Sequence, residues 1–295
     1  MTTPPVCDYE GSDYQKTFWD SGAREYEDRC ERIALAKMLP PTGTRLCEIG
    51  AGFGRLAGLY AGYQQVILLD YSHSMLRQAV SRLQGDRRFL FVAADLYALP
   101  LADSAVDTAV TVRVLHHVAD IPRAFGEISR IVRPGGAYLT EFANKRHVKH
   151  RIRHALTRQP PDPSSLEPYE FVKLNFDFHP RYIENNLRSA QFTPQAVRAV
   201  STFRLPVFKR AVPASLLAAL DGLLQSPTGR LELSPSLFVR ASSDKPGERT
   251  ASAPLWRCPA CASTDIVAGS DSLACRNCAR VYPILDGIID FKSQL

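Results

Sequence analysis

Short apolar segments alternate with amphipathic ones along the first half of the chain. Runs of apolar residues with few charges, separated by helix-length polar segments, are typical of a parallel sheet covered on both faces. We therefore predict a doubly wound α/β domain. The predicted strands are 44–50, 65–70, 89–95, 106–112 and 137–142, and the predicted helices between them are 53–60, 73–83 and 121–132.

The pattern also predicts what lies on either side of these units. A helix over 22–39 carries Ile33, Leu35, Ala36 and Met38 at helical spacing, and two prolines stop it. After residue 144 the chain turns basic and then proline-rich, which indicates an insertion or lid after the fifth strand. A helix over 179–192 and a strand over 237–242 follow. We expect one domain over 1–243, a linker over 244–254 and a small domain over 255–295.

Composition places the chain among ordinary globular proteins. Its 295 residues are 45% hydrophobic and 22% charged, with a net charge of +6. The start of the chain lacks a basic and apolar secretion signal. The most apolar helical segment, 213–225, is short and contains Asp221, so it falls below a membrane span. We expect a soluble, cytoplasmic protein without a membrane span.

A glycine-rich turn follows the first predicted strand. Glu48, Gly50, Gly52 and Gly54 read E-x-G-x-G-x-G, and Asp70 ends the second strand. A dinucleotide fingerprint would place its third glycine at position 55, one residue later than here. The turn alone therefore indicates a nucleotide-like ligand, and a tight turn without a ligand is the alternative.

Further motifs follow in a specific order. The third strand ends in Asp95 and Leu96, "LPLADSAVDTAV" leads into the fourth, and "VLHHVAD" and "EISRIVRPGGAYL" come next. In this order, residues 20–142 resemble the class I S-adenosylmethionine-dependent methyltransferases, in particular the ubiquinone/menaquinone-type subgroup. The resemblance implies a Rossmann-like methyltransferase sheet with an N-terminal helical cap over the cofactor.

The resemblance also implies a set of cofactor-binding residues. It places Glu48 near the methionine amino group, Asp70 on the ribose hydroxyls, Asp95 on the adenine amino group and Arg113 beside the methionine. The full set is Glu48, Gly50, Ala51, Gly52, Gly54, Asp70, Tyr71, Asp95, Leu96 and Arg113. Local roles are the alternatives, because Glu48 could pair with Arg45 or Arg55, and either aspartate could cap a helix or turn.

The catalytic residue stays open at this point. Methyl transfer has a neutral leaving group, so a base is required only for a protonated acceptor. The weak candidates are His117, Glu141 and Tyr26, and for His117 we favour a packing or cofactor-shell role. Tyr26 belongs to an aromatic cluster with Tyr14, Phe18 and Trp19, which either walls a pocket or fixes the first helix.

A basic stretch follows the fifth strand. Six lysines and arginines lie between positions 145 and 158, with three histidines among them and no acidic residue. A solvated helix is the first interpretation, an anionic small substrate or lipid head group the second, and RNA phosphate the third. No RNA-binding signature accompanies the charges.

Four of the seven cysteines form two CxxC pairs near the end of the chain. Cys258, Cys261, Cys275 and Cys278 have the pattern of a tetrathiolate zinc site. With "YPILDGI" at 282–288, the segment resembles the zinc-ribbon activator subunits of methyltransferases. The resemblance implies a structural Zn2+ and a ribbon that docks on the catalytic domain or on a protein partner.

We expect these features to make a methyltransferase for a small organic acceptor such as a quinone, lipid or secondary metabolite. One alternative is an RNA methyltransferase, although strand four ends in "TVRVLHH" and not in the Pro-Pro-Tyr type of motif used for base amines. The other is a non-catalytic scaffold that binds the cofactor and acts through its ribbon.

Overall fold

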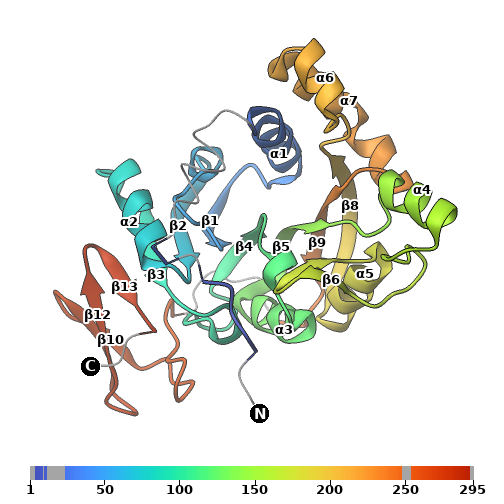
Figure 1. The fold of residues 1–295 in the computed structure, drawn as a ribbon. Helices are drawn as coiled ribbons and strands as arrows, with labels where there is room; N and C mark the ends of the chain where they lie inside the picture. The colour runs from blue at the N-terminus through green and yellow to red at the C-terminus, as the bar shows by residue number, and fades with distance from the viewer. Residues whose placement is uncertain (1–3, 9, 12–23, 248–253, 293–295) are drawn as a thin grey trace.

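The computed structural model describes residues 4–8, 10–11, 24–247 and 254–292. One large sheet runs through these residues, with helices on both of its faces (Figure 1). The predicted α/β class is confirmed. The helices, including three short 3-10 turns labelled η, are α1 Glu25–Met38, η2 Ala57–Leu59, α2 His73–Arg82, η3 Leu96–Ala98, η4 Leu115–His117, α3 Ile121–Ile131, α4 Val148–Thr157, α5 Pro180–Ser189, α6 Pro206–Ala211 and α7 Ala214–Leu231.

The strands follow the same alternation through the first half of the chain. They are β1 Gly43–Ile49, β2 Tyr63–Asp70, β3 Phe89–Ala93, β4 Val106–Thr111, β5 Val132–Ala143, β6 Tyr169–Val172, β7 Asn175–Asp177, β8 Phe192–Val200, β9 Ser236–Ser243, β10 Ile266–Ala268, β11 Ser272–Cys275, β12 Val281–Leu285 and β13 Ile288–Asp290.

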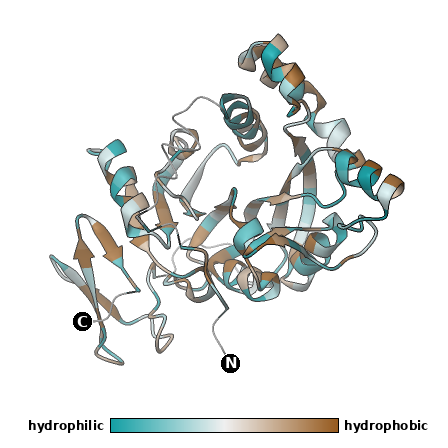
Figure 2. Ribbon diagram, viewed as in Figure 1, coloured by the Kyte–Doolittle hydropathy of each residue, from teal (hydrophilic) through white to brown (hydrophobic). Residues whose placement is uncertain are grey.

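The centre of the sheet is parallel, in the order β3-β2-β1-β4-β5. Its strands are buried on both faces, as their unbroken apolar runs require. Figure 2 shows these strands as mostly hydrophobic, with polar residues on the outer sides of the helices. The sheet is not parallel throughout, because β9 pairs antiparallel with both β5 and β8. The parallel sheet predicted from the five apolar strands is therefore confirmed, and the later strand predicted over 237–242 is β9, which joins that sheet antiparallel.

The segment after β1 differs from its predicted helix at 53–60. The structure has turns there and only the short η2. Gly50, Gly52 and Gly54 all have positive φ, between +54° and +73°. A right-handed helix cannot include residues with positive φ, so the chain forms turns until η2 begins.

The insertion after β5 contains a hairpin that the sequence pattern did not predict. Strands β6 and β7 pair antiparallel, and the turn between them places Leu174 at φ +55°. The basic stretch forms α4, which ends at Arg158 in the left-handed conformation. Short exposed strands with no apolar alternation carry too weak a signal to be recognised in advance.

The C-terminal ribbon extends the main sheet. Strand β13 pairs in parallel with β3, with Ile289 opposite Val92, so that eleven strands form one continuous order. Asp286 and Gly287, both at positive φ, join β12 to β13 in a two-residue hairpin turn. Residues 255–292 are thus seated on the edge of the main sheet, a position that the sequence left undecided.

Helix α1 packs against α7 on one face of the sheet. The Tyr26 hydroxyl donates to Asp221 Oδ2 at 2.7 Å, and the Gln225 amide donates to the Cys30 carbonyl at 2.9 Å. The buried side of α1 follows Tyr26, Cys30, Ala34 and Met38, whereas Ala36 is exposed. Within the described ranges no helix is both long and apolar enough to cross a membrane.

Candidate functional site

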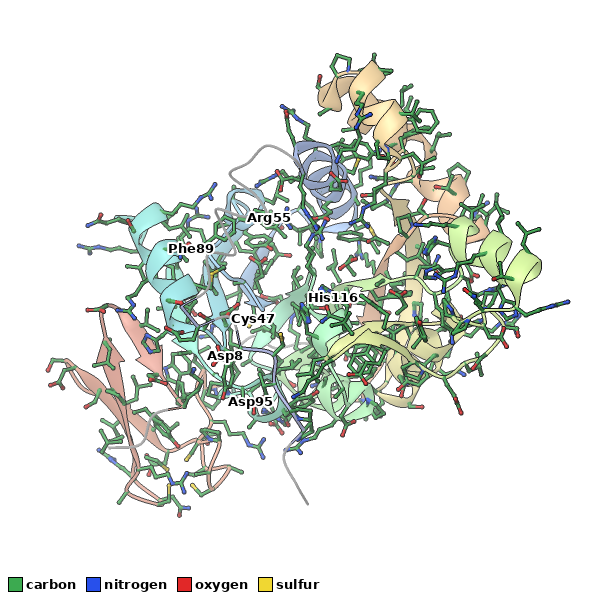
Figure 3. The ribbon with its side chains drawn as sticks, in the orientation of Figure 1. Asp8, Cys47, Arg55, Phe89, Asp95 and His116 are labelled. Carbon is green, nitrogen blue, oxygen red and sulfur yellow. The ribbon has the colours of Figure 1, made fainter. Side chains whose placement is uncertain are left out.

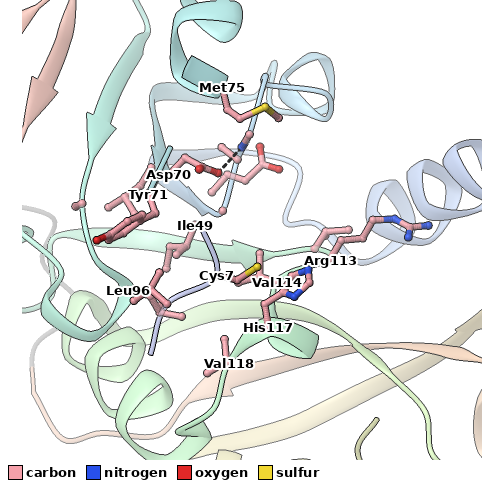
Figure 4. Close-up of a pocket in the computed structure, with 18 of the residues that line it drawn as sticks. Cys7, Ile49, Asp70, Tyr71, Met75, Leu96, Arg113, Val114, His117 and Val118 are labelled. Carbon is pink, nitrogen blue, oxygen red and sulfur yellow. Dashed lines mark hydrogen bonds between the residues drawn. The ribbon is translucent and has the colours of Figure 1, made fainter. Parts of the chain in front are cut away.

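A pocket opens at the carboxyl ends of the central strands. Its empty volume, which includes space open to solvent, is about 1070 Å³. Such crevices are where α/β sheets bind ligands. The lining comes from the loops after β1, β2, β3 and β4, from Met75 of α2 and from residues 5–7, as Figure 4 shows in part.

The glycine turn after β1 forms one wall of this pocket. A Cβ on Gly50 would lie 2.3 Å from Val114 Cγ2, and Gly50 has φ +73°. Gly50 therefore allows the turn to pass directly beneath the loop after β4. Gly52 has φ +54°, and its amide donates to Asp70 Oδ2 at 2.7 Å (Figure 4).

Asp70 organises the loop between β2 and α2. Its Oδ1 accepts the Ser72 amide at 2.8 Å, and Ser72 caps α2 by accepting the Met75 amide at 3.3 Å. Ser72, not Asp70, is therefore the N-cap. Burial raises the pKa of Asp70, although the amides of Ser72 and Gly52 oppose the rise. Its carboxylate lines the pocket with both oxygens held in place.

Glu48 is the most unusual carboxyl group of the site. It is only 3% exposed, it lines the pocket, and its Oε2 has no hydrogen-bond partner among the described residues. Burial raises the pKa of Glu48 to about 8, although the Tyr60 hydroxyl and Arg55 favour the charged form. A buried carboxyl oxygen without a partner is costly, so this atom is suited to a donor from a ligand.

The two arginines that the sequence offered as partners of Glu48 bond elsewhere. Arg45 Nε donates to Gln65 Oε1 at 3.1 Å. Arg55 forms ion pairs with Asp28 and with Glu31 of α1, the latter at 2.7 Å. Figure 3 places Arg55 next to α1.

Glu31 joins both sides of the pocket. Besides Arg55 of the glycine turn, its carboxylate binds Arg113 of the loop after β4. Burial works against the charged form, yet Arg113 and Arg55 hold the pKa of Glu31 below its usual value. The ion pair between Glu31 and Arg55 could not be predicted from the sequence, because it depends on how α1 crosses the sheet.

The other predicted cofactor residues lie along the same pocket. Asp95 caps η3 by accepting the Tyr97 amide at 2.9 Å, and Leu96 follows it. Tyr71 and Ala51 also line the pocket, as does Arg113, which has φ +61°. The structure thus brings all ten predicted positions together except Gly54, which packs behind the turn near Leu83 and Ala79.

The structure places the three catalytic candidates in different surroundings, and only one of them lines the pocket. His117 lines the pocket, and its Nδ1 lies 2.9 Å from the Leu174 carbonyl. Glu141 is buried, accepts from the Arg113 amide and Ser236 Oγ, and is not part of the lining. Tyr26 is buried against α7 through Asp221. Tyr26 therefore fixes the first helix and does not wall the pocket, and Glu141 is buried outside the lining.

The N-terminal part of the chain contributes Pro5, Val6 and Cys7 to the lining, which sequence analysis missed. Figure 4 shows Cys7 facing into the pocket near His117. Tyr14, Phe18 and Trp19 lie outside the described residues. No described residue beyond Val118 lines the pocket. The place of residues 5–7 in the lining could not be predicted, because a short segment that packs on a distant part of the chain leaves no periodic pattern in the sequence.

The four paired cysteines come together in the ribbon. Their sulfurs all lie within 4.8 Å of one another, with Cys258 and Cys278 3.6 Å apart and Cys261 and Cys275 3.5 Å apart. A disulfide would be about 2.05 Å. Four thiolates around zinc at about 2.3 Å would be roughly 3.8 Å apart, so the residues fit that metal. The Tyr282 hydroxyl lies 3.0 Å from Cys258 Sγ.

Comparisons with known sequences agree with this geometry. Residues 47–140 match the family model described as a methyltransferase domain. A demethylmenaquinone methyltransferase of Roseiflexus sp. (strain RS-1) is 36% identical over 132 residues, which are 43% of this chain and 54% of that protein. A 27-O-demethylrifamycin SV methyltransferase of Amycolatopsis mediterranei is 31% identical over 43% of this chain and 49% of that protein. The chain thus spans about half the length of these curated relatives.

Solved structures show the same fold. A Haloferax volcanii complex of the Trm112 methyltransferase activator with a putative methyltransferase aligns with a TM-score of 0.55 at 17% identity, over 79% of this chain and 96% of that one. An S-adenosylmethionine-dependent methyltransferase from Mesorhizobium loti aligns at 0.50 and 19% identity, over 72% and 97%. Residues 47–140 are thus similar to a methyltransferase domain, and the two solved structures show that the chain has a Rossmann-like α/β fold.

Proposed function

We propose that this chain is an S-adenosylmethionine-dependent methyltransferase acting on a small organic acceptor. The observation that carries the proposal is the buried Glu48 oxygen without a partner, at the wall of the pocket. A cationic ammonium donor would satisfy that oxygen and stabilise the ionised carboxylate. The methionine end of this cofactor carries such a group.

The remaining pocket residues would hold the rest of the cofactor. Asp70 would accept hydrogen bonds from both ribose hydroxyls, and its carboxylate is already oriented by the Gly52 and Ser72 amides. Asp95 would accept from the adenine amino group beside Leu96. Arg113 would border the methionine part. A site held in advance by its own hydrogen bonds loses little entropy when it binds.

The cofactor supplies the activated methyl group on a sulfonium, and its leaving group is a neutral thioether. The chain therefore has to position an acceptor and, for a protonated one, to remove a proton. His117 is the candidate that borders the pocket. Because a carbonyl only accepts, Nδ1 donates to Leu174 and the lone pair of the neutral ring is on Nε2. Burial lowers the pKa of His117 and favours this neutral form.

The small-molecule assignment is supported by the relatives. These relatives include methyltransferases named for demethylmenaquinone, malonyl-[acyl-carrier protein] and 27-O-demethylrifamycin SV. The pocket combines several aliphatic side chains with few polar groups, as small-molecule sites do. RNA methylation is the alternative, and a cofactor-binding scaffold is the third hypothesis.

Two linked measurements test the proposal. Calorimetry with S-adenosylhomocysteine should give binding to the wild type, and Asp70→Ala should weaken it by roughly 2 kcal/mol or more through loss of charge-assisted hydrogen bonds. Asp86→Ala is the control, because Asp86 pairs with Arg88 outside the pocket lining. Equal affinity of the wild type, Asp70→Ala and Asp86→Ala would contradict the assignment of Asp70 to the ribose hydroxyls.

Transfer of labelled methyl groups into fractionated cell extract then separates the functions. Label in the organic-soluble fraction supports the small acceptor, and label in RNA supports the alternative. Cofactor binding with no labelled fraction favours the scaffold.

We further propose that residues 255–295 form a zinc ribbon with a structural metal, held by Cys258, Cys261, Cys275 and Cys278. Residues 1–243 would then be the catalytic domain and 244–254 the linker. Four protein ligands leave no open position for chemistry, and a segment this small draws much of its stability from the metal. Native mass spectrometry should find one zinc per chain, and Cys258→Ser should lose it while Ser263→Ala keeps it. Metal-free wild type would contradict the ribbon assignment.

A further inference from the structure

Helix α4 exposes an aliphatic stripe that no described residue covers. Val148, Ile152 and Leu156 are four residues apart, so they share one face of the helix. Their exposed fractions are 49%, 56% and 80%, and no residue of α4 is buried. A stripe of this kind on an ordinary solvated helix would be polar.

Cations flank this stripe on both sides. Lys149 and Arg153 are exposed on one side of it, at positions one residue beyond Val148 and Ile152. Arg151 lies on the other side, where its guanidinium donates to the Leu231 carbonyl at 3.2 Å and lies 3.6 Å from Glu232. No acidic residue occurs between positions 144 and 161.

The histidine side of α4 faces the protein. His150 Nδ1 lies 3.8 Å from Asp177 Oδ2 of β7. The helix start is held by the Val148 amide, which donates to the Leu233 carbonyl at 3.1 Å. These contacts anchor one face of α4 and leave the aliphatic stripe outward.

We propose that α4 docks on the surface of an anionic lipid bilayer. An interfacial helix needs an apolar stripe that enters the headgroup boundary and lysines or arginines beside it that meet anionic headgroups. Val148, Ile152 and Leu156 supply the stripe, and Lys149 and Arg153 supply the flanking charge. RNA is a weaker match, because phosphate contacts do not use aliphatic side chains and α4 has no aromatic residue other than histidine for stacking bases.

The neighbouring helices have the same character. Between positions 203 and 231 the only acidic residue is Asp221, which is buried against Tyr26. Figures 1 and 2 show α4 and α6 at the same end of the molecule, with hydrophobic positions on both. The ribbon lies at the opposite end of the sheet. The exposed apolar residues here include Leu205, Val207, Phe208, Leu216, Leu220 and Leu223.

The docking surface is also connected to the pocket wall. Asp177, which contacts α4 through His150, belongs to the β6–β7 hairpin. The same hairpin contacts His117 of the pocket through the Leu174 carbonyl. Bilayer docking does not depend on the proposed reaction, but it would place the hairpin side of the pocket near the membrane surface.

Vesicle flotation tests the proposal with the full chain. We expect the wild type to float with vesicles of phosphatidylcholine and phosphatidylglycerol and not with phosphatidylcholine alone, and to be released by high salt. Ile152→Ser/Leu156→Ser should weaken binding about tenfold or more through lost apolar burial. Lys149→Gln/Arg153→Gln should weaken it about fivefold for each charge removed. Leu285→Ser, an exposed apolar change in the ribbon, is the matched control and should bind as the wild type does.

Three outcomes would overturn the inference. The first is wild type that fails to float with the anionic vesicles at low salt. The second is unchanged flotation of Ile152→Ser/Leu156→Ser, which would show that the aliphatic stripe does not enter the bilayer and that only charge attracts the protein. The third is binding of total tRNA, but not of vesicles, that is lost in Lys149→Gln/Arg153→Gln, which would assign the surface to nucleic acid. Thermal unfolding of each variant checks that binding is lost from a folded protein.

Discussion

Lys292, just after β13 of the ribbon, places its Nζ 4.0 Å from the centroid of the Tyr71 ring in the pocket wall. Its charge also lowers the pKa of Asp70, against the larger effect of burial. A residue of the C-terminal segment thus contacts the site built by residues 48–118. We predict that Lys292→Gln weakens S-adenosylhomocysteine binding by at most about 0.5–1 kcal/mol, the usual range of an exposed cation–π contact, because ligand binding would then have to order the Tyr71 ring without that contact. Lys292→Arg should retain most of the affinity in calorimetry, and equal affinity of the Gln variant and the wild type would show that the contact is only structural.

The buried Glu48 predicts a proton released on cofactor binding. Burial raises the pKa of Glu48 to about 8, so the group is mostly protonated at pH 7 without ligand. A cationic ligand binds the ionised form, so affinity should rise between pH 6 and pH 8. Calorimetry in buffers of different ionisation enthalpy should detect release of about one proton at pH 7. Glu48→Gln should bind without that release, and release that persists in this variant would assign the proton to another group.

The same group makes the ligand-free fold sensitive to alkaline pH. A carboxyl whose folded pKa is raised stabilises the fold fully below its unfolded pKa, about 4.3, and this contribution is lost as pH rises through 8. We predict that the free energy of unfolding falls by an amount on the order of a few kcal/mol over this window. Denaturant unfolding at pH 5 and pH 9 measures it. A wild type and a Glu48→Gln variant with parallel pH profiles would contradict the assignment.

Two glycines that follow β1, Gly50 and Gly58, offer a matched pair of substitutions for the turn. Gly50→Ala places a methyl group 2.3 Å from Val114 Cγ2 at φ +73°, so the turn has to shift. A left-handed non-glycine residue alone costs about 1–2 kcal/mol, and the clash adds to it. Gly58→Ala meets nothing within 4 Å and should be nearly neutral. Thermal unfolding and S-adenosylhomocysteine titration should show lower stability and weaker binding for Gly50→Ala than for Gly58→Ala. Equal stability and affinity of the two variants would show that the turn accommodates the added methyl group.

Pairing of β13 with β3 predicts that the ribbon stabilises the catalytic sheet. Ile288 is fully buried in a cluster with Leu76 and Ala93, so Ile288→Ala should destabilise the protein by about 2–5 kcal/mol. Leu285, three residues earlier, is exposed, and Leu285→Ala should change stability by less than about 0.5 kcal/mol. Denaturant unfolding followed by a probe in the catalytic domain compares them. A transition that responds to Ile288→Ala only in the ribbon would show that the two parts unfold separately.

Much of the fold and several site positions could be predicted because their signals are local. Strands β1 to β5 are apolar runs that need two covered faces, and the Ser72 cap and the Asp120 start of α3 are short-range hydrogen bonds. The carboxyl ends of parallel strands lie at the same edge of a sheet. Glu48, Asp70 and Asp95 therefore had to lie close together, and all three line the pocket. The CxxC spacing likewise brings sulfurs together within one ribbon.

The predictions that were wrong depended on contacts between distant segments. The helix over 53–60 gave way to a turn because Gly50, Gly52 and Gly54 take positive φ, and Gly50 passes directly beneath Val114. Tyr26 and Glu141 were candidates for the catalytic residue. In the structure the Tyr26 hydroxyl donates to Asp221 and the Glu141 carboxylate accepts from Ser236, and both partners come from the second half of the chain.

By itself the sequence determined the α/β alternation, the glycine turn with its acidic residues and the four-cysteine ribbon, because each is encoded within a few neighbouring positions. Only the tertiary structure decided that α1 reaches Arg55 and Arg113 through Glu31, that β13 extends the sheet at β3, and that α4 keeps an uncovered aliphatic stripe. Those relationships depend on which surfaces meet when the chain packs, and sequence periodicity shows that a face is apolar without showing what covers it.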